Sequence, residues 1–466
     1  MLNNYIIEES KNIPISGNFD VVIVGGGLTG VMAAISTARN GLNTILVEKQ
    51  AYYGGVGAMG RPLQGFYDLD NNQIIKGLPD EFIARLRACN GASPEFIQCE
   101  MHNPFLVVDP EMVKLVCQQM LIESGVKLLL HTFATEVILE SSAIKGVLIE
   151  NKSGRQCLLG NVFIDCSGDG DIAKAAGVPY SFGRETDGQS QASTLMFRLD
   201  NVNIEALIRK VLNEPDDYDL IPTLPRIQFN YNKQHILVGL GKFISKARNE
   251  GMYAIPWDRV CYITCIHEGS VMINMVHVEN MDATDGHQLT QIELEGRAQI
   301  GPIHQFLKHY ITGFEQSTLA FSAPCSGIRE TRHMLGEYVL TEDDIIKGII
   351  TDDTVVVGGY PIDIHFSSPN TESALEFEHV SPYGIPYRCM LPKEVENLLI
   401  AGRCISATHR ALASIRVMGT CMGLGQAAGL AAVLSKKVNW HPKKVSAVNL
   451  RRLLLDSGAY ISDSNA

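Results

Sequence analysis

The feature that most constrains the fold of this chain is a glycine turn between an apolar segment and a helical segment, close to its start. Residues 19–24 are apolar and mostly β-branched, which predicts a buried parallel strand. The sequence GGGLTG follows at 25–30, and a helical pattern continues over 31–39. A second short apolar strand is predicted over 44–47 and ends at Glu48. This order predicts a βαβ unit that binds a dinucleotide.

Each position of this turn has a separate expected task. Gly25 permits the tight turn, Gly27 lets backbone N–H groups approach a pyrophosphate, and Gly30 allows the helix and strand to pack closely. The N-terminus of the helix adds unpaired N–H groups and a positive dipole end. Glu48 is placed to accept hydrogen bonds from ribose hydroxyls, and Lys49 is expected beside it in the cofactor site. The alternative, a glycine turn without a nucleotide, is disfavoured because strand, turn, helix and acidic residue all occur in order.

Composition narrows the class of protein. The chain has 466 residues, of which 45% are hydrophobic and 19% charged, a balance typical of packed globular domains. Its net charge of −12 argues against nucleic acid as the main partner, because phosphate binding requires a basic surface. We expect no membrane span and no secretory signal, because no apolar run reaches roughly 20 residues. The 11 cysteines are scattered without a CxxC pair, so we expect a cytoplasmic protein with reduced thiols and no iron–sulfur cluster.

The chain is predicted to be an α/β protein in which a Rossmann-like nucleotide-binding domain, a parallel sheet with helices and a β-meander, is interrupted by an α+β substrate domain. Residues 1–180 and 321–466 form the first domain in this interpretation, and residues 181–320 form the second. The middle part is more polar and contains a loop around Pro215 to Pro225. Beyond the first βαβ unit, helices are predicted over 110–124 and 414–434, and strands or hairpins over 126–130, 135–149, 162–164, 260–278 and 397–400.

FAD and NAD share the glycine fingerprint, so later segments must distinguish between them. A second glycine–acid turn follows a strand at 165–171, and a third strand and turn at 398–403 precede a helix rich in small residues. With these motifs the sequence resembles the glutathione-reductase-like FAD fold and, more closely, the bacterial FAD-dependent oxidoreductase family of that fold. The resemblance covers nearly the whole chain and is strongest in the N-terminal fingerprint and in residues 163–179, 327–344 and 401–432.

The resemblance implies where the cofactor FAD lies. The N-terminus of the helix that begins near Ser414 would point at the N1/C2 edge of the flavin, where a positive dipole end stabilises the anionic reduced ring. Gly419 and later glycines would let this helix pack against cofactor and sheet, although ordinary helix packing is the alternative. Six further residues are implied, along the pyrophosphate and flavin (Gly54, Gly55), the adenosine (Gly168, Asp169) and the ribityl chain (Gly402, Arg403).

Flavin enzymes that exchange hydride with a substrate need an acid or base near the flavin N5. His409 lies between the Gly402 turn and the last helix, in a place expected to face the flavin ring. A structural histidine bonded to the backbone is the alternative. His365 lies in a loop-like segment after a glycine turn and is a second candidate for substrate binding or catalysis.

Two arginines are candidate cations for a carboxylated substrate. Arg329, together with Glu330 and Arg332, either binds a carboxylate through a guanidinium fork or belongs to an internal ion-pair network. Arg416 is expected in the first turn of the last helix. A cation there opposes the helix dipole unless a bound anion or the flavin offsets it.

Other residues are weaker candidates. Tyr52, Tyr53 and Arg61 lie in a glycine-rich loop that either covers the substrate or, as we expect, is plain surface. Cys261 and Cys265 share one face of a predicted strand but lie about 13 Å apart, at about 3.3 Å per residue, which is too far for one metal ion. We therefore predict no metal site.

We predict an FAD-dependent oxidoreductase, a dehydrogenase or reductase that exchanges hydride between flavin N5 and a small polar or carboxylated substrate. Residues 180–320 hold no second GxGxxG, so the electron donor or acceptor stays open. One alternative is a redox-neutral flavin-assisted isomerase or dehydratase, and another is an electron-transfer subunit of a larger complex. The large substrate domain favours the enzyme. Substrate identity, direction of electron flow, covalent attachment of FAD and formation of a homo-oligomer stay open as well.

Overall fold

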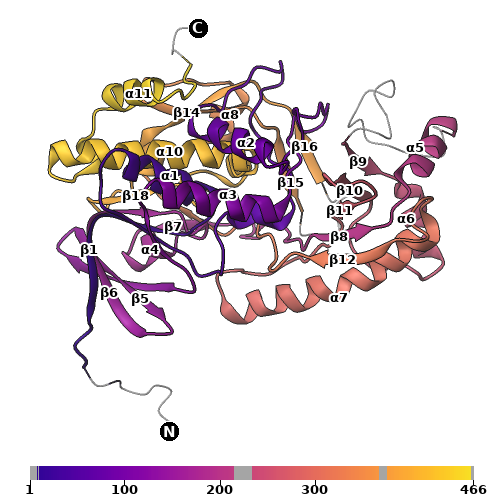
Figure 1. The fold of residues 1–466 in the computed structure, drawn as a ribbon, viewed down its shortest axis with the longest axis horizontal. Coiled ribbons are helices and arrows are strands. Elements are labelled where there is room, and N and C mark those ends of the chain that lie inside the picture. Colours follow the sequence, from indigo (N-terminus) through magenta and orange to yellow (C-terminus); the bar gives the residue numbers. More distant parts are fainter. Residues whose placement is uncertain (1–7, 9, 215–233, 367–374, 463–466) are drawn as a thin grey trace.

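A seven-stranded mixed sheet forms the centre of the nucleotide-binding part (Figure 1). The computed structural model describes residue 8 and residues 10–214, 234–366 and 375–462, so the predicted loop around Pro215 and Pro225 lies outside the described residues. The strand order is β3-β2-β1-β6-β5-β4, and β18 also pairs with β6. The strands are β1 (Ile15–Val24), β2 (Thr44–Val47), β3 (Lys127–Leu129), β4 (Phe133–Glu140), β5 (Ala143–Asn151), β6 (Gly154–Asp165) and β18 (Leu398–Ile400).

The parallel strands of this sheet end at the same edge. β2, β1, β6 and β18 run parallel, with Val47, Val24 and Asp165 in register and Asp165 opposite Ile400. β4 and β5 continue the sheet as an antiparallel meander beside β6. The predicted α/β fold with a parallel sheet, helices and a meander is therefore confirmed.

Helices pack beside this sheet, and local signals explain where several of them begin and end. α3 begins at Pro110 because the Asp109 side chain accepts hydrogen bonds from the N–H groups of Glu111 and Met112. α1 ends at Asn40, where Gly41 takes a φ of 79°. The helices of this part are α1 (Leu28–Arg39), α2 (Leu78–Ala88), α3 (Pro110–Glu123), α4 (Asp171–Ala175), α8 (Glu342–Ile346), α9 (His409–Ile415), α10 (Met418–Ser435) and α11 (Ala447–Asp456).

A second, antiparallel sheet has the strand order β12-β8-β11-β10-β9. One of its faces packs against three helices around a hydrophobic core that includes Leu237 and Tyr262. The alternate residues of the same strands, such as Val238 and Cys261, belong to another buried cluster on the opposite face. The elements are β8 (Phe197–Asp200), β9 (Ile236–Gly239), β10 (Val260–Thr264), β11 (Val271–Ile273), β12 (Thr318–Ser322), α5 (Ile204–Asn213), α6 (Gly241–Asn249) and α7 (Gly286–Tyr310).

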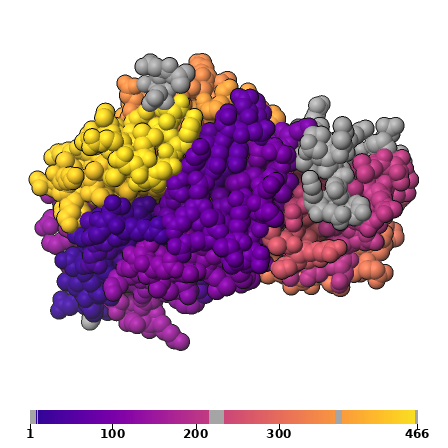
Figure 2. All heavy atoms as spheres, turned by 45° about the horizontal axis from the view of Figure 1, so that its top comes forward, coloured from indigo at the N-terminus to yellow at the C-terminus, as the bar shows by residue number. Residues whose placement is uncertain are grey.

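The two sheets lie at opposite ends of the molecule. In Figure 2 the yellow C-terminal segment and the indigo N-terminal segment lie together at one end, and the magenta-to-orange residues of the second sheet lie at the other. Residues 21–178 and 334–461 contribute to one hydrophobic core, whereas the second core is formed almost entirely within 195–323. The exact domain boundaries stay a prediction. Three short antiparallel pairs complete the fold, namely β7 (Tyr180–Phe182) with β13 (Arg332–Met334), β14 (Thr354–Gly358) with β17 (Tyr383–Pro386), and β15 (Ile362–His365) with β16 (Leu375–Glu378).

The predicted helix over 414–434 is broken in the structure. α9 ends at Ile415, and α10 begins only at Met418, after Val417 in an extended conformation. At the break, the N–H of Gly419 donates to the carbonyl of Gln64 at 2.8 Å, in a crossing loop that is far away in the sequence. The expectation of one continuous helix was therefore wrong.

Among the described residues, one helical stretch, Met418–Val438, is long and apolar enough to span a membrane by length and composition, which the sequence interpretation did not expect. Within the fold, 78% of its apolar window is buried. A Cβ at Gly425 would lie 2.1 Å from the carbonyl oxygen of Thr29, so α10 lies directly against α1. This is the environment of a core helix, and Gly425 and Gly429 pack against α1, which was the alternative interpretation of these glycines.

Candidate active site

The predicted cofactor residues gather around a cavity at the carboxyl ends of β1, β2, β6 and β18. This is the edge at which open α/β sheets bind nucleotides. The cavity encloses about 1330 Å³, including space open to solvent. Nine of the predicted cofactor residues line it: Gly25, Gly27, Glu48, Lys49, Gly54, Gly55, Gly168, Gly402 and Arg403.

The three fingerprint glycines differ in what surrounds each of them. Gly25 has a φ of 102°, and a Cβ on it would lie 2.2 Å from the carbonyl oxygen of Cys166. A Cβ on Gly30 would lie 1.9 Å from the carbonyl oxygen of Gly25, so Gly30 does not line the cavity but closes the turn behind it. A Cβ on Gly27 would meet no atom within 4 Å. Of these three glycines, Gly27 is therefore the one whose Cα faces open space.

Two features beside this opening suit the two ends of an adenosine diphosphate group. α1 begins without a side-chain cap and without an acidic residue in its first turn, which leaves its N–H groups for a pyrophosphate. The buried Glu48 carboxylate accepts the N–H of Gly26 at 2.6 Å and the N–H of Gln50 at 2.7 Å, one on each oxygen. Each oxygen keeps a second lone pair, which can accept a ribose hydroxyl.

The far end of the cavity is lined by two arginines, Arg329 and Arg416, whose buried side chains have incomplete hydrogen bonding. Burial, and then the charges of Arg61 and Arg416, hold the pKa of Arg329 well below its ordinary value. The Nε atoms of Arg329 and Arg416 and the Oγ atom of Ser326 are buried without a hydrogen-bond partner within the described part of the chain. The N-terminus of α10, which has no side-chain cap, opens here through Val417 and Met418. An electron-rich flavin edge would satisfy these groups, so the residues of this cavity fit FAD.

Two predicted cofactor residues lie behind the cavity wall and do not line it. Asp169 binds Arg403, with 2.6 Å between its Oδ1 and the arginine Nη2, and so holds a residue that does line the cavity. Gly419 packs against the loop that breaks the helix, because a Cβ on it would lie 2.7 Å from the carbonyl oxygen of Gln64. The structure thus gives Gly419 a packing position rather than the predicted cofactor contact.

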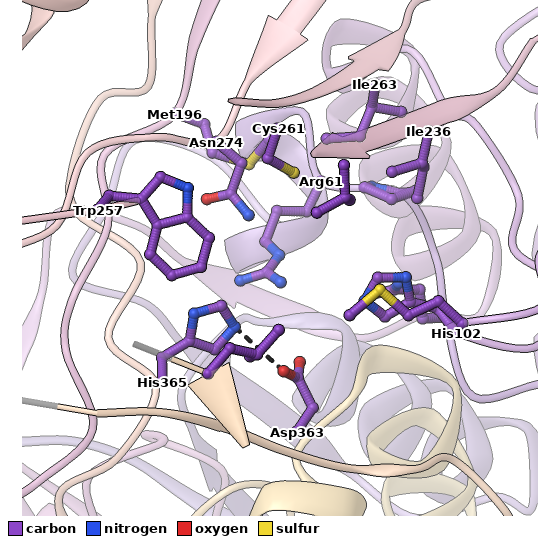
Figure 3. A pocket seen from close by; sticks show the side chains of 15 residues that line it. Arg61, His102, Met196, Ile236, Trp257, Cys261, Ile263, Asn274, Asp363 and His365 are labelled. Atoms are coloured by element: carbon purple, nitrogen blue, oxygen red, sulfur yellow. Dashed lines mark ion pairs between the residues drawn. The ribbon is translucent and has the colours of Figure 1, made fainter. Parts of the chain in front are cut away.

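A second cavity adjoins the first and shares Arg61 and Gln64 with it (Figure 3). It encloses about 520 Å³, including space open to solvent. Apolar side chains of β9 and β10 form one wall, His365 and Asp363 lie opposite, and Trp257 lies at one side between them. The larger, glycine-lined cavity therefore suits the dinucleotide, and the smaller one suits a substrate beside it.

His365 belongs to a buried ion-pair chain in the second cavity. Its Nε2 lies 3.2 Å from Oδ1 of Asp363, and the other oxygen of Asp363 lies 3.5 Å from Nη2 of Arg416. Burial alone would raise the pKa of Asp363, but His365 and Arg416 outweigh it and hold that pKa well below its usual range. Burial, and then the charge of Arg329, hold the pKa of His365 well below 6.5. The pair is therefore a carboxylate and a neutral imidazole.

The hydrogen-bond network assigns the tautomer of His365. A neutral ring that donates its Nε2–H to Asp363 carries a free lone pair at Nδ1. This Nδ1 is buried and has no hydrogen-bond partner among the residues that the structure describes. Trp257 stacks on the ring, with 5.3 Å between centroids and an interplanar angle of 21°. The His365 ring is thus held in a fixed orientation, and its Nδ1 is available as a proton acceptor.

The structure places His409 away from both cavities, contrary to the predicted position facing the flavin. Its Nδ1 lies 2.7 Å from Oε1 of Glu330, and Nε2 of His333 lies 2.9 Å from the same oxygen. Burial would raise the pKa of Glu330, but the hydrogen bonds from His333 and His409 hold that pKa at about 2. His409 thus belongs to a buried cluster around a carboxylate, and its ring bonds Glu330 rather than the backbone that the alternative interpretation named.

The Arg-Glu-x-Arg run divides between the two predicted roles. Arg332 joins an internal network, with 3.0 Å to Asp171, whereas Arg329 lines the first cavity. Arg416 also lines that cavity, but at the C-terminal end of α9 rather than in the first turn of α10. A cation at a helix C-terminus is favourable, so the predicted conflict with the dipole was wrong.

Several residues of the second cavity were missed or misplaced by sequence reasoning. His365 lies in strand β15, not in a loop, and Asp363 two positions earlier points to the same face. That Asp-x-His spacing was an available signal. Arg61 was interpreted as plain surface, yet it lies between the cavities. Tyr53 is buried against Gly26, and neither it nor Tyr52 lines either cavity.

Curated relatives match parts of the chain. The 3-oxosteroid 1-dehydrogenase of Mycobacterium tuberculosis is 37% identical over 100 residues, which cover 21% of this chain and 17% of that protein. Digeranylgeranylglycerophospholipid reductase 2 of Methanothermobacter thermautotrophicus is 25% identical over 35% of this chain and 43% of its own length. Thiamine thiazole synthase of Methanococcus vannielii is 29% identical over 29% of this chain and 47% of its own. The chain thus spans less than half the length of each of these relatives.

Solved structures align with most of the chain at low identity. A geranylgeranyl bacteriochlorophyll reductase-like protein of Thermoplasma acidophilum is 12% identical, with 95% of this chain and 84% of its own covered and a TM-score of 0.44. A flavin-dependent brominase is 14% identical, with 94% and 84% covered and a TM-score of 0.47. Membership of the glutathione-reductase-like subgroup stays a prediction. Residues 20–454 match the family described as FAD dependent oxidoreductase, and the chain belongs to this family of enzymes, with FAD as its cofactor.

Proposed function

We propose that this chain is a dehydrogenase of a small carboxylated substrate, which binds in the second cavity next to the flavin end of the first. FAD, when bound, supplies hydride exchange at the flavin N5. The observation that carries the proposal is the proton acceptor of His365, which is buried and unpaired in a cavity that adjoins the cofactor site. A substrate that loses a hydride from carbon also loses a proton, and a neutral imidazole accepts it.

Three residues support this role for His365. Asp363 fixes the ring through Nε2 and stabilises the imidazolium that forms when Nδ1 takes a proton. Trp257 holds the plane of the ring. Arg416 keeps Asp363 ionised, so the pair stays ready to accept a proton at neutral pH. In the reverse direction the same imidazolium donates the proton, as a reductase requires.

Arg61 supports the carboxylated class of substrate. It lines both cavities, and no ion pair joins it to any residue within the described ranges. A guanidinium in this position binds a carboxylate through two parallel hydrogen bonds and orients the neighbouring carbon. The carboxylate would also offset the mutual repulsion that Arg61, Arg329 and Arg416 exert on one another.

Anaerobic reduction of the flavin tests the proposal. The FAD-loaded protein is mixed without oxygen with a panel of small hydroxy, amino and saturated acids, each paired with its amide. We expect loss of the visible flavin absorbance with at least one acid and not with its amide. Reduction by uncharged compounds alone, or equal reduction by an acid and its amide, would contradict the carboxylate part of the proposal. A spectrum that stays oxidised while a substrate is consumed would replace dehydrogenation by redox-neutral chemistry.

A further inference from the structure

We infer that the substrate is an amphipathic monocarboxylate, whose single carboxylate binds Arg61 and whose apolar group packs against the second sheet. This inference rests on the proposed function and narrows its substrate class. Its basis is the contrast between one unpaired cation and an apolar wall in the same cavity (Figure 3).

The apolar wall is one face of two neighbouring strands. Ile236 and Val238 of β9 and Cys261 and Ile263 of β10 all line the cavity, while the residues between them point into the core of the second sheet. Met196 adds a flexible thioether to the same wall. A small polar substrate would leave this surface without a matching group. An apolar group would be removed from water against it.

The charges of the cavity favour one carboxylate and not two. Among the described residues of the lining, Arg61 is the one arginine. Within the same described ranges the lining holds one carboxylate, Asp363, which already binds His365 and Arg416 and stays ionised. A second carboxylate on the substrate would have no cation of its own and would approach the negative charge of Asp363. Dicarboxylates are therefore disfavoured by repulsion.

Four simple probes separate the two parts of the inference: phenylacetate, phenylacetamide, acetate and succinate. Each is titrated into the FAD-loaded protein, and binding is read by calorimetry and by the change in the visible flavin spectrum. We expect phenylacetate to bind at least tenfold more tightly than each of the other three. The comparison with phenylacetamide tests the carboxylate, and the comparison with acetate and succinate tests the apolar group and the single charge.

Two variants assign the binding to the residues named. Arg61→Met should weaken phenylacetate binding at least tenfold and leave phenylacetamide unchanged. The matched control is Arg209→Met, an exposed arginine on α5, which should change neither. Val238→Thr, a nearly isosteric change that adds a hydroxyl to the apolar wall, should weaken phenylacetate binding several-fold and leave acetate unchanged. If Arg61→Met loses its FAD, Arg61→Lys replaces it, since this variant keeps the charge but not the fork.

Equal binding of phenylacetate and acetate, tighter binding of succinate, or binding of none of the four probes overturns the inference. So does an Arg61 variant that binds phenylacetate as the wild type does. The proposed dehydrogenation is judged separately by anaerobic flavin reduction. Reduction by a small polar acid, combined with equal probe affinities, would thus remove the inference and leave the proposed function standing.

Discussion

The two adjoining cavities of this molecule are built from different material. The cofactor cavity is positioned by glycine turns that follow four parallel strands, where the backbone itself forms part of the wall. The second cavity is formed by side chains from segments far apart in the chain, including Arg61, Trp257, Cys261 and His365. A site built from backbone requires glycine at fixed spacing, whereas a site built from side chains places no such demand on local sequence. This difference explains why the first site was predicted and most of the second was not.

The comparison predicts that the second cavity depends on its ion pairs for stability. Asp363→Ala should lower the free energy of unfolding by about 3–5 kcal/mol, because it leaves Arg416 buried without its carboxylate. Chemical denaturation of the FAD-free protein measures this change. The control Asp343→Ala removes an exposed ion pair with Lys347 and should cost less than about 1 kcal/mol. Equal losses of unfolding free energy in both variants would show that the buried ion pair stabilises the protein no more than the exposed one.

Two glycine variants sharpen the account of the cofactor cavity. Gly30→Ala should destabilise the protein by about 3 kcal/mol, because the added Cβ would lie 1.9 Å from a backbone oxygen. Gly27→Ala should change the stability of the FAD-free protein by less than about 0.5 kcal/mol, since its Cβ meets no atom within 4 Å. It should nevertheless weaken FAD binding, measured by flavin fluorescence. If Gly27→Ala binds FAD normally, the pyrophosphate does not approach this turn.

The ionic cluster of Glu330, which lies outside both cavities, predicts a pH effect. Its pKa is lowered to about 2, so the stability that its charge contributes is present above the ordinary value of 4.5 and is lost as the pH falls from 4.5 towards 2. Glu330→Gln keeps the shape but not the charge, and should cost about 1 kcal/mol at neutral pH. Thermal unfolding at several pH values measures both proteins. Their difference should shrink below pH 4.5, and a difference that grows there would contradict the assignment.

The fold could be predicted well wherever local rules determine it. Residues 25–30 with Glu48 identified the first βαβ unit, and Asp109 with Pro110 marked the start of α3, because caps and tight turns depend on neighbouring residues. The break before α10 could not be predicted, since it depends on a hydrogen bond from Gly419 to Gln64, far away in the sequence.

The candidate site follows the same division. His365 was identified by residue type but assigned to a loop, because β15 is only four residues long and its pairing with β16 leaves no local signal. His409 was predicted to be catalytic because it lies shortly before the last helix in the sequence. Its burial beside Glu330 depends on tertiary packing that no local pattern encodes.

The most direct test of the account is the rate of anaerobic flavin reduction in wild type, His365→Gln and His409→Gln, with an acid that reduces the wild-type flavin. His365→Gln should retain FAD and reduce it about 10²–10⁴-fold more slowly, the usual contribution of a general base. His409→Gln should reduce it at the wild-type rate, because His409 lines neither cavity. Reduction of the His365→Gln flavin at the wild-type rate, or a large loss confined to His409→Gln, would contradict the placement of the reaction in the second cavity.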